Sequence, residues 1–305
     1  MASSDIATPH PAKTPVREGW VDSDGLKLRY VEWGERGAPA IVALHGLRSF
    51  AFTWEPAAQR LAERFHVIAL DMRGRGMSQW DPARRYYTES YVHDLEALVD
   101  KLRLPAFVLL GHSMGGATAL VYASRHPERL AALVIEDIGP GSSANSAGAD
   151  RIRRELHETP DRFDSWFDAT AFWRRQRPNV SEAALQARVL HSMKADDRGV
   201  VVWRHDAQGI AEARLNATPE QLVDLWPHVE AVSRPMLLLR GARSDFLSAD
   251  VAREMCRRNA NIQCDEIAAA GHYVHDDNFA AFESSLHRFL GSPSLAAWAR
   301  GTPNA

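Results

Sequence analysis

A serine flanked by glycines constrains this chain more than any other feature of its sequence. Residues 111–116 read Gly-His-Ser-Met-Gly-Gly; they follow the apolar run 107–110 and precede the helix-forming stretch 117–123. The pattern predicts a tight turn from a strand into a helix, with Ser113 at its apex in a strained backbone conformation. Side chains at the glycine positions would collide with the neighbouring strand and helix. The Ser113 hydroxyl is therefore expected to project from the edge of a sheet.

The rest of the sequence alternates short apolar runs with helix-forming stretches, which predicts a mostly parallel sheet with helices on both faces. Residues 20–31, with an Asp-Gly turn in the middle, predict an antiparallel hairpin. Further apolar runs predict buried strands at 40–44, 67–70, 107–110, 132–135, 236–239 and 262–267. Helices are expected at 54–65, 88–102, 117–126, 249–258 and 278–290. The predicted fold class is α/β, with an eight-stranded sheet.

One segment, 141–232, interrupts this alternation. It is dense in helix formers, arginine and aromatic residues, and its only strand-like run is 200–202. We interpret it as a helical cap inserted between the sixth and seventh strands of a core that comprises residues 16–140 and 233–290. Most of its aromatic side chains are expected to hold the cap to the core, and one or two to line a pocket. Residues 1–15 are expected to form a disordered leader and residues 291–305 a loose tail.

Composition argues against several classes of function. The formal net charge of −3, without a basic stripe, gives no indication of nucleic-acid binding. No apolar segment has the length needed to cross a membrane, and the leader lacks the apolar centre of a secretory signal. Two cysteines rule out a disulfide framework, so a cytoplasmic location is expected. No metal site and no cofactor are predicted, and the oligomeric state is left open.

The turn at Ser113 requires a base, because a serine hydroxyl is a poor nucleophile unless another group accepts its proton. The chain contains 13 histidines. Among them, His272 directly follows the last predicted strand, at the sheet edge where Ser113 also emerges. We therefore predict that His272 is the base.

The acid that orients this base has two candidates. Asp137 follows the sixth predicted strand and Asp245 follows the seventh, so both loops lie at the same edge of the sheet. Asp245 comes four residues after Gly241, where three is usual, and Ser244 occupies the usual place. Asp137 lies at the end of the strand that follows the serine, which is the expected register. We prefer Asp137 and keep Asp245 as the alternative.

Two backbone N–H groups are predicted to bind the oxyanion that forms when the serine attacks a carbonyl. One belongs to Met114, directly after the serine, and the other to Leu47 in the Leu-His-Gly-Leu-Arg loop 44–48. Each such donor contributes about 3 kcal/mol of transition-state stabilisation. The neighbouring Arg48 is predicted to bind a substrate carboxylate. A salt bridge at the cap boundary is the alternative for Arg48.

Taken together, these motifs resemble the α/β-hydrolase superfamily. The resemblance covers residues 19–290 and rests on His45-Gly46, the glycine-rich loop 71–78, the stretch 111–116 and Gly271-His272, in that order. Within the superfamily the chain looks like small bacterial esterases, enol-lactonases and hydrolases of C–C or amide bonds. The stretches 136–140 and 240–244 are similar to members that take the acid from the sixth strand, one group of which resembles 2-(acetamidomethylene)succinate hydrolase, a cofactor-independent amide hydrolase.

The resemblance implies a serine hydrolase that cleaves a small carboxylic ester or lactone through an acyl-enzyme, with a small-molecule ester, lactone or amide as its partner. A C–C or amide hydrolase with the same triad, acting on a carboxylate-bearing substrate, is the alternative. Haloperoxidase-like members carry the same serine motif, and a receptor that closes its cap on a ligand without turnover is a further interpretation. Dehalogenases and epoxide hydrolases of this fold carry aspartate at the position of Ser113, which argues against both.

Overall fold

The computed structural model describes residues 14–144, 146–178 and 180–300, so the predicted leader lies almost entirely outside the described residues. Eight strands form one sheet in the order β1-β2-β4-β3-β5-β6-β10-β11, which confirms the predicted α/β fold class. The strands of this sheet are β1 (Arg17–Ser23), β2 (Leu26–Trp33), β3 (Ala40–Leu44), β4 (His66–Leu70), β5 (Phe107–His112), β6 (Leu130–Glu136), β10 (Met236–Gly241) and β11 (Ile262–Ile267). The pair β1–β2 and the pair β2–β4 are antiparallel, and the other neighbours are parallel.

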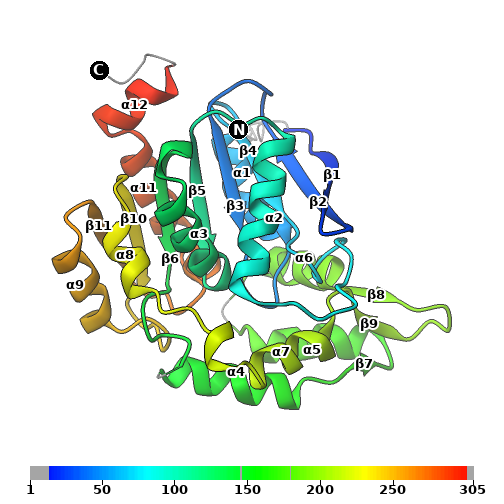
Figure 1. The fold of residues 1–305 in the computed structure, drawn as a ribbon. Helices are drawn as coiled ribbons and strands as arrows, with labels where there is room; N and C mark the ends of the chain where they lie inside the picture. The colour runs from blue at the N-terminus through cyan, green and yellow to red at the C-terminus, as the bar shows by residue number, and fades with distance from the viewer. Residues whose placement is uncertain (1–13, 145, 179, 301–305) are drawn as a thin grey trace, which may run out of the picture.

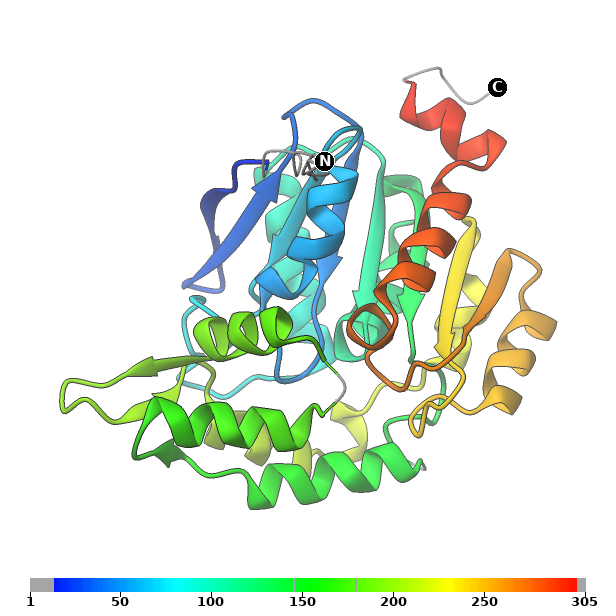
Figure 2. The same cartoon turned by 180° about the vertical axis from the view of Figure 1, so that it is seen from behind.

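Helices cover both faces of the sheet (Figures 1 and 2). One face packs against α2 (Thr88–Lys101), α3 (Met114–Arg125), α8 (Trp226–Ala231) and α9 (Ala249–Arg258). The other packs against α1 (Glu55–Leu61) and α11 (Phe279–Leu290).

Strand β3 illustrates why both faces are apolar. Val42 and Leu44 join the hydrophobic cluster on the α2–α3 face, whereas Ile41 and Ala43 join the cluster on the α1–α11 face. Successive side chains of a strand point to opposite faces. A strand buried on both sides therefore needs the continuous apolar run that the sequence shows.

The segment between β6 and β10 forms a cap next to the C-terminal edge of the sheet (Figure 1). Its helices are α4 (Ala147–Glu158), α5 (Trp166–Gln176), α6 (Glu182–Ser192) and α7 (Ala207–Leu215), followed by α8. It also contains an antiparallel three-stranded sheet in the order β7-β9-β8, formed by β7 (Arg162–Phe163), β9 (Val201–Trp203) and β8 (Met193–Ala195). The strand-like run at 200–202 corresponds to β9, but the helical prediction missed β7 and β8 because strands of two or three residues are too short to show a period in the sequence.

Most aromatic residues of the cap were expected to pack against the core, but several of them pack within the cap instead. Phe172, Trp173 and Trp203 pack with each other in a hydrophobic cluster of the cap itself. Trp166 and Phe167 are exposed. The expectation that these side chains hold the cap to the core is therefore wrong, since the cap buries apolar surface of its own.

The C-terminal tail corrects a second expectation. Instead of a loose tail, the chain forms α12 (Pro293–Ala299), whose Leu295 is buried. Trp298 stacks on Phe65, and its indole N–H donates to the Ala106 carbonyl at 3.0 Å. In the described ranges, no helix combines the length and the apolar character needed to span a membrane.

Candidate active site

Ser113 lies between β5 and α3 in a backbone conformation that side chains rarely adopt, with φ 52° and ψ −117°. The turn is so tight that a Cβ atom on Gly115 would lie 2.5 Å from the Leu44 carbonyl oxygen. The predicted steric need for glycine therefore holds at Gly115. Strain of this kind persists only where the surroundings fix it, and it is common at functional sites.

The structure brings Ser113, His272 and Asp137 into one hydrogen-bonded chain. His272 Nε2 lies 2.9 Å from Ser113 Oγ, and His272 Nδ1 lies 2.8 Å from Asp137 Oδ2. A carboxylate can only accept, so Nδ1 carries the proton and Nε2 is left to accept from the serine hydroxyl. All three side chains are buried, although they are distant in the sequence.

Two further donors hold Asp137 in place. The Ser244 hydroxyl donates to Oδ2, and the Gly241 N–H donates to Oδ1 at 3.0 Å. Burial raises the pKa of Asp137, and both hydrogen bonds oppose that rise because they stabilise the carboxylate. Sequence reasoning noted that Ser244 occupies the usual place of the acid but did not assign it this function. Since the acid is found after β6 instead of at position 244, the serine at that position could have been inferred to hydrogen-bond the acid.

Asp245, the alternative acid, is engaged elsewhere. Its two carboxylate oxygens accept from Arg151 Nε at 2.8 Å and from Arg151 Nη2 at 3.0 Å, so it ties α4 of the cap to the loop after β10. The structure therefore places Asp137, and not Asp245, against the ring of His272.

His272 is set up to be neutral at pH 7. Burial lowers its pKa, and the nearby positive charge of Arg151 acts in the same direction. The ring packs against Phe246, with centroids 4.3 Å apart. The carbonyl oxygen of His272 lies 2.9 Å from Nε2 of His112, the residue that precedes the serine. The loop that carries His272 is thus fixed to the strand that carries Ser113.

The loop after β3 is fixed by His45, one of its own side chains. His45 Nδ1 lies 2.8 Å from the Gly46 carbonyl, and His45 Nε2 accepts from the Met72 N–H at 3.1 Å. This pins the peptide between Gly46 and Leu47. The N–H of a trans peptide points away from its carbonyl, so the direction of the Leu47 N–H is also fixed. Burial lowers the pKa of His45 to about 4, which keeps the ring in this neutral form.

Leu47, Ser113 and Met114 line the same cavity, of about 370 Å³, between the sheet edge and the cap. The Met114 N–H belongs to the first turn of α3, where a helix leaves its N–H groups without an intrahelical acceptor. Arg75 adds a hydrogen bond from Nε to the Leu47 carbonyl at 3.1 Å. The two N–H groups predicted to bind an oxyanion therefore belong to residues that line the cavity beside the serine.

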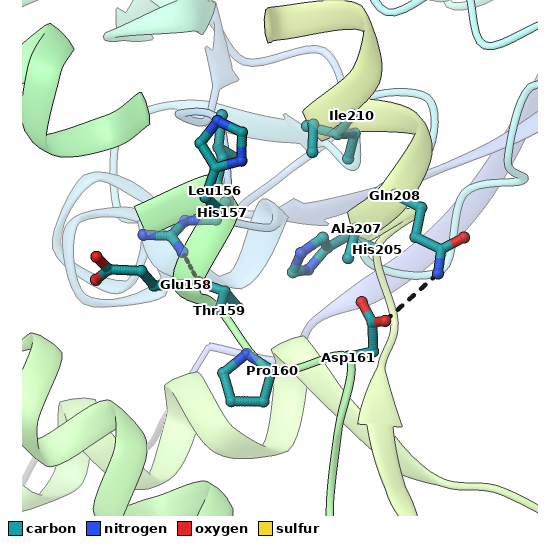
Figure 3. A pocket seen from close by; sticks show the side chains of 12 residues that line it. Leu156, His157, Glu158, Thr159, Pro160, Asp161, His205, Ala207, Gln208 and Ile210 are labelled. Carbon is teal, nitrogen blue, oxygen red and sulfur yellow. Dashed lines mark hydrogen bonds between the residues drawn. The ribbon is translucent and has the colours of Figure 1, made fainter. Parts of the chain in front are cut away.

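Arg48 does not line this cavity, which corrects the prediction that it binds a substrate carboxylate. It forms an ion pair with Glu155 of α4 and donates to the Thr159 hydroxyl at 2.8 Å. It lines a separate cavity of about 390 Å³, between the end of α4 and the start of α7, to which Thr159 and His205 also contribute (Figure 3). Glu155 already neutralises its charge, so the salt bridge at the cap boundary is what the structure shows.

A second chain of carboxylate, histidine and hydroxyl lies directly beside the first. His275 Nδ1 lies 2.7 Å from Glu136 Oε1, and His275 Nε2 lies 3.0 Å from the Thr53 hydroxyl. Burial by itself would lower the pKa of His275, but the charges of Glu136 and Asp276, together with the hydrogen bond to Glu136, outweigh it and the pKa is raised. Within the part of the chain that the structure describes, no group of three or more histidine, cysteine or acidic side chains has the geometry of a metal site.

Comparison with known proteins assigns the fold to a family. The family model described as alpha/beta hydrolase fold matches residues 39–279, most of the chain. The chain belongs to the α/β-hydrolase family.

Among relatives of this α/β hydrolase, the 2-(acetamidomethylene)succinate hydrolase of Mesorhizobium japonicum is 26% identical over 90% of this chain and 93% of its own length. An esterase of Mycobacterium tuberculosis is 28% identical over 81% of this chain and 80% of its own length. The crystal structure of E-2-(acetamidomethylene)succinate hydrolase superposes with a TM-score of 0.82 at 24% identity, over 91% of this chain and all of that one. The family resemblance seen in the motifs is thereby confirmed.

Proposed function

We propose that this protein is a serine hydrolase in which Ser113 attacks an acyl carbon, His272 moves the proton and Asp137 orients the histidine. The observation that carries the proposal is the hydrogen-bonded chain from Asp137 Oδ2 through His272 to Ser113 Oγ, with distances of 2.8 and 2.9 Å. A serine, a base and an orienting acid in hydrogen-bond reach are the parts that acyl transfer requires. The cavity of about 370 Å³ is large enough for a small substrate.

The proposed reaction has two halves. His272 Nε2 takes the proton from Ser113 Oγ as this atom attacks the carbonyl, and the N–H groups of Leu47 and Met114 bind the resulting oxyanion. The imidazolium then gives its proton to the leaving group, which departs and leaves an acyl-enzyme. Water, deprotonated by His272, attacks the acyl-enzyme and releases the acid.

A small carboxylic ester or lactone is the substrate class that we propose first. The esterase among the relatives supports it. An amide or C–C bond is the second candidate, and the relationship to 2-(acetamidomethylene)succinate hydrolase supports it, because the same three side chains serve both reactions.

The test is the substitution Ser113→Ala, assayed with p-nitrophenyl acetate and p-nitrophenyl butyrate. We expect a loss of at least about 10⁴-fold in kcat, together with the loss of labelling by a fluorophosphonate probe. Thr53→Val is the matched control, since it removes the hydroxyl of the neighbouring chain and should leave turnover within about twofold. Undiminished hydrolysis by Ser113→Ala would overturn the proposal. A parallel panel of lactones and amides separates the two substrate classes.

A further inference from the structure

Two arginines of the loop that follows β4 differ in a way that bears on the substrate. Arg73 and Arg75 are both fully buried. Arg73 forms ion pairs with Asp94, Asp81 and Asp24, as expected for a buried cation. Arg75 donates only to uncharged acceptors among the residues that the structure describes.

The acceptors of Arg75 are two carbonyls, a hydroxyl and a sulfur. Nε donates to the Leu47 carbonyl. Nη1 donates to the Arg73 carbonyl and to the Tyr91 hydroxyl, both at 2.8 Å. Nη2 lies 3.4 Å from the Met114 sulfur.

Arg75 therefore has no ion pair in the described ranges. The rings of Tyr86 and Tyr91 lie 5.2 and 5.1 Å from its Cζ, and its guanidinium lies against the two residues proposed to bind the oxyanion. A buried charge without a counter-ion is costly, and this one lines the cavity on which Ser113 opens.

Arg214, on α7 of the cap, is a second cation without an ion pair in the described ranges, although it is only half-buried. It lines the same cavity, and its Nη2 donates to the Ser143 carbonyl at 3.0 Å. This is the one protein acceptor that its guanidinium has in the described ranges, so most of its donors are unused. Burial lowers the pKa of Arg214, and the charge of Arg153 lowers it further.

The remaining wall of the cavity supplies no negative charge. Its 25 lining residues include three arginines and no aspartate or glutamate. Arg153, the third arginine, forms an ion pair with Asp150 of its own helix. The other side chains are mainly apolar or aromatic, among them Tyr87, Ile210 and Leu225.

We propose that Arg214, with the positive charge of Arg75 behind it, forms a subsite for a carboxylate of the substrate, so that the protein acts on acyl compounds that carry a free carboxylate near the scissile carbonyl. The subsite rests on the proposed function of Ser113, since it is defined by the same cavity. A guanidinium presents parallel N–H donors that match a carboxylate, and such charge-assisted pairs are about twice as strong as neutral hydrogen bonds. The apolar wall fits a short carbon chain between the carboxylate and the ester or amide.

Arg214 is the residue to change, because Arg75 also holds the Leu47 carbonyl and its loss would disturb every substrate. The assay compares two substrates of similar size, the 4-nitrophenyl monoester of glutaric acid and 4-nitrophenyl valerate. The measured quantity is the ratio of kcat/KM for the anionic ester to that for the neutral ester. In Arg214→Gln we expect this ratio to fall about 10- to 100-fold, mainly through KM, because a hydrogen-bonded charge pair is lost. In Arg214→Lys, which keeps the positive charge, the ratio should lie between those of Arg214→Gln and the wild type.

Binding without turnover gives a second readout. Glutarate should inhibit hydrolysis of 4-nitrophenyl valerate competitively in the wild type, and its inhibition constant should rise about 10-fold or more in Arg214→Gln. Arg154→Gln is the matched control: it removes an exposed arginine of α4 that does not line the cavity, and both the ratio and the inhibition constant should stay unchanged.

The outcomes separate this inference from the proposed function. A ratio and an inhibition constant that Arg214→Gln leaves as in the wild type overturn the subsite, while hydrolysis that depends on Ser113 leaves the proposed function standing. Inhibition by inorganic phosphate that is tighter than inhibition by glutarate, and that is lost in Arg214→Gln, would also overturn the carboxylate assignment. Hydrolysis that survives Ser113→Ala overturns the proposed function itself.

Discussion

Two histidines three positions apart, His272 and His275, each hold a carboxylate from the end of β6, and their pKa values are shifted in opposite directions. The carboxylate of Asp137, which contacts His272, also accepts from the Ser244 hydroxyl and the Gly241 N–H. Burial lowers the pKa of His272. His275 has both Glu136 oxygens within 2.9 Å, and its pKa is raised.

The consequence for proton transfer is direct. A neutral imidazole has a lone pair at Nε2 that can accept a hydroxyl proton, whereas an imidazolium donates from both nitrogens. His272 can therefore serve as a base toward Ser113, whereas the raised pKa of His275 favours the imidazolium, which donates to Thr53. Similar sets of side chains at similar distances thus give one chain suited to catalysis and one that joins loops as a buried ion pair.

The backbone around the two hydroxyls differs as well. Ser113 stands at the start of the 12-residue helix α3, in a strained turn beside the cavity. Thr53 lies in the 3₁₀ segment Ala51–Trp54 and does not line that cavity. In the proposed reaction, oxyanion binding requires a hydroxyl at the start of a helix, and attack on a substrate requires a hydroxyl beside the cavity. Of these two residues, Ser113 meets both requirements and Thr53 meets neither.

The largest expected effect concerns the acid. Asp137→Asn should lower kcat about 10⁴-fold, because an amide N–H toward His272 favours the wrong tautomer of the ring. Asp245→Asn, which breaks only the ion pair with Arg151, should stay within about threefold of the wild type. Steady-state kinetics of both variants provide the measurement. Near-wild-type rates for Asp137→Asn would mean that the acid has been assigned to the wrong residue.

A smaller effect is expected for the second pair, and on stability. Glu136→Gln removes the carboxylate that is hydrogen-bonded to the buried His275 and leaves it only the more distant Asp276, 3.8 Å from Nε2, which should lower the free energy of unfolding by about 3 kcal/mol. Urea denaturation followed by tryptophan fluorescence measures this loss. Asp137→Asn is the comparison variant, and a smaller loss of stability is expected for it. Equal losses in the two variants would remove the distinction between the pairs.

The smallest expected effect is a shift along the pH axis. The base must be neutral, so kcat/KM falls as the pH drops through the pKa of His272 in the free protein. Burial lowers this pKa, so the acidic limb should lie below pH 6.5, the usual value for histidine, with a plateau from there to pH 8. A limb centred above pH 6.5 would contradict this assignment.

Stability should change in the same acidic range, so fluorescence must be recorded alongside the rates. Burial lowers the pKa of His45, His112 and His205 as it does that of His272. Their contribution to stability is complete above about pH 6.5 and is lost as the pH falls toward the lowered pKa values. The contribution of His275 has the opposite sign: it is complete below about pH 6.5 and is lost as the pH rises through the raised pKa.

Much of the fold followed from local pattern. The hairpin, the six predicted strands and the turn at Ser113 lie where the sequence predicts them, because each is set by side-chain period or by the need for glycine over a few residues. The strand at 262–267 was expected to be buried, but β11 is the edge strand of the sheet and only Ile262 and Ile267 are buried in it. The loose tail was wrong, and the prediction of a helical cap indicated one of its three short strands, at 200–202, but not the other two. The contact of Trp298 with Phe65, and the pairing of strands two or three residues long, depend on partners that no local window contains.

The sequence by itself determined the candidate nucleophile and base, Ser113 and His272, because each stands in a short motif at the end of a predicted strand. Only the tertiary structure decided which aspartate faces His272, that Arg48 is already paired, and that Arg75 and Arg214 line one cavity without an ion pair to any residue that the structure describes. The physical reason is distance along the chain. Ion pairs join side chains more than a hundred residues apart, as between Arg48 and Glu155. The neighbours of a residue in the sequence therefore do not indicate whether its charge is paired.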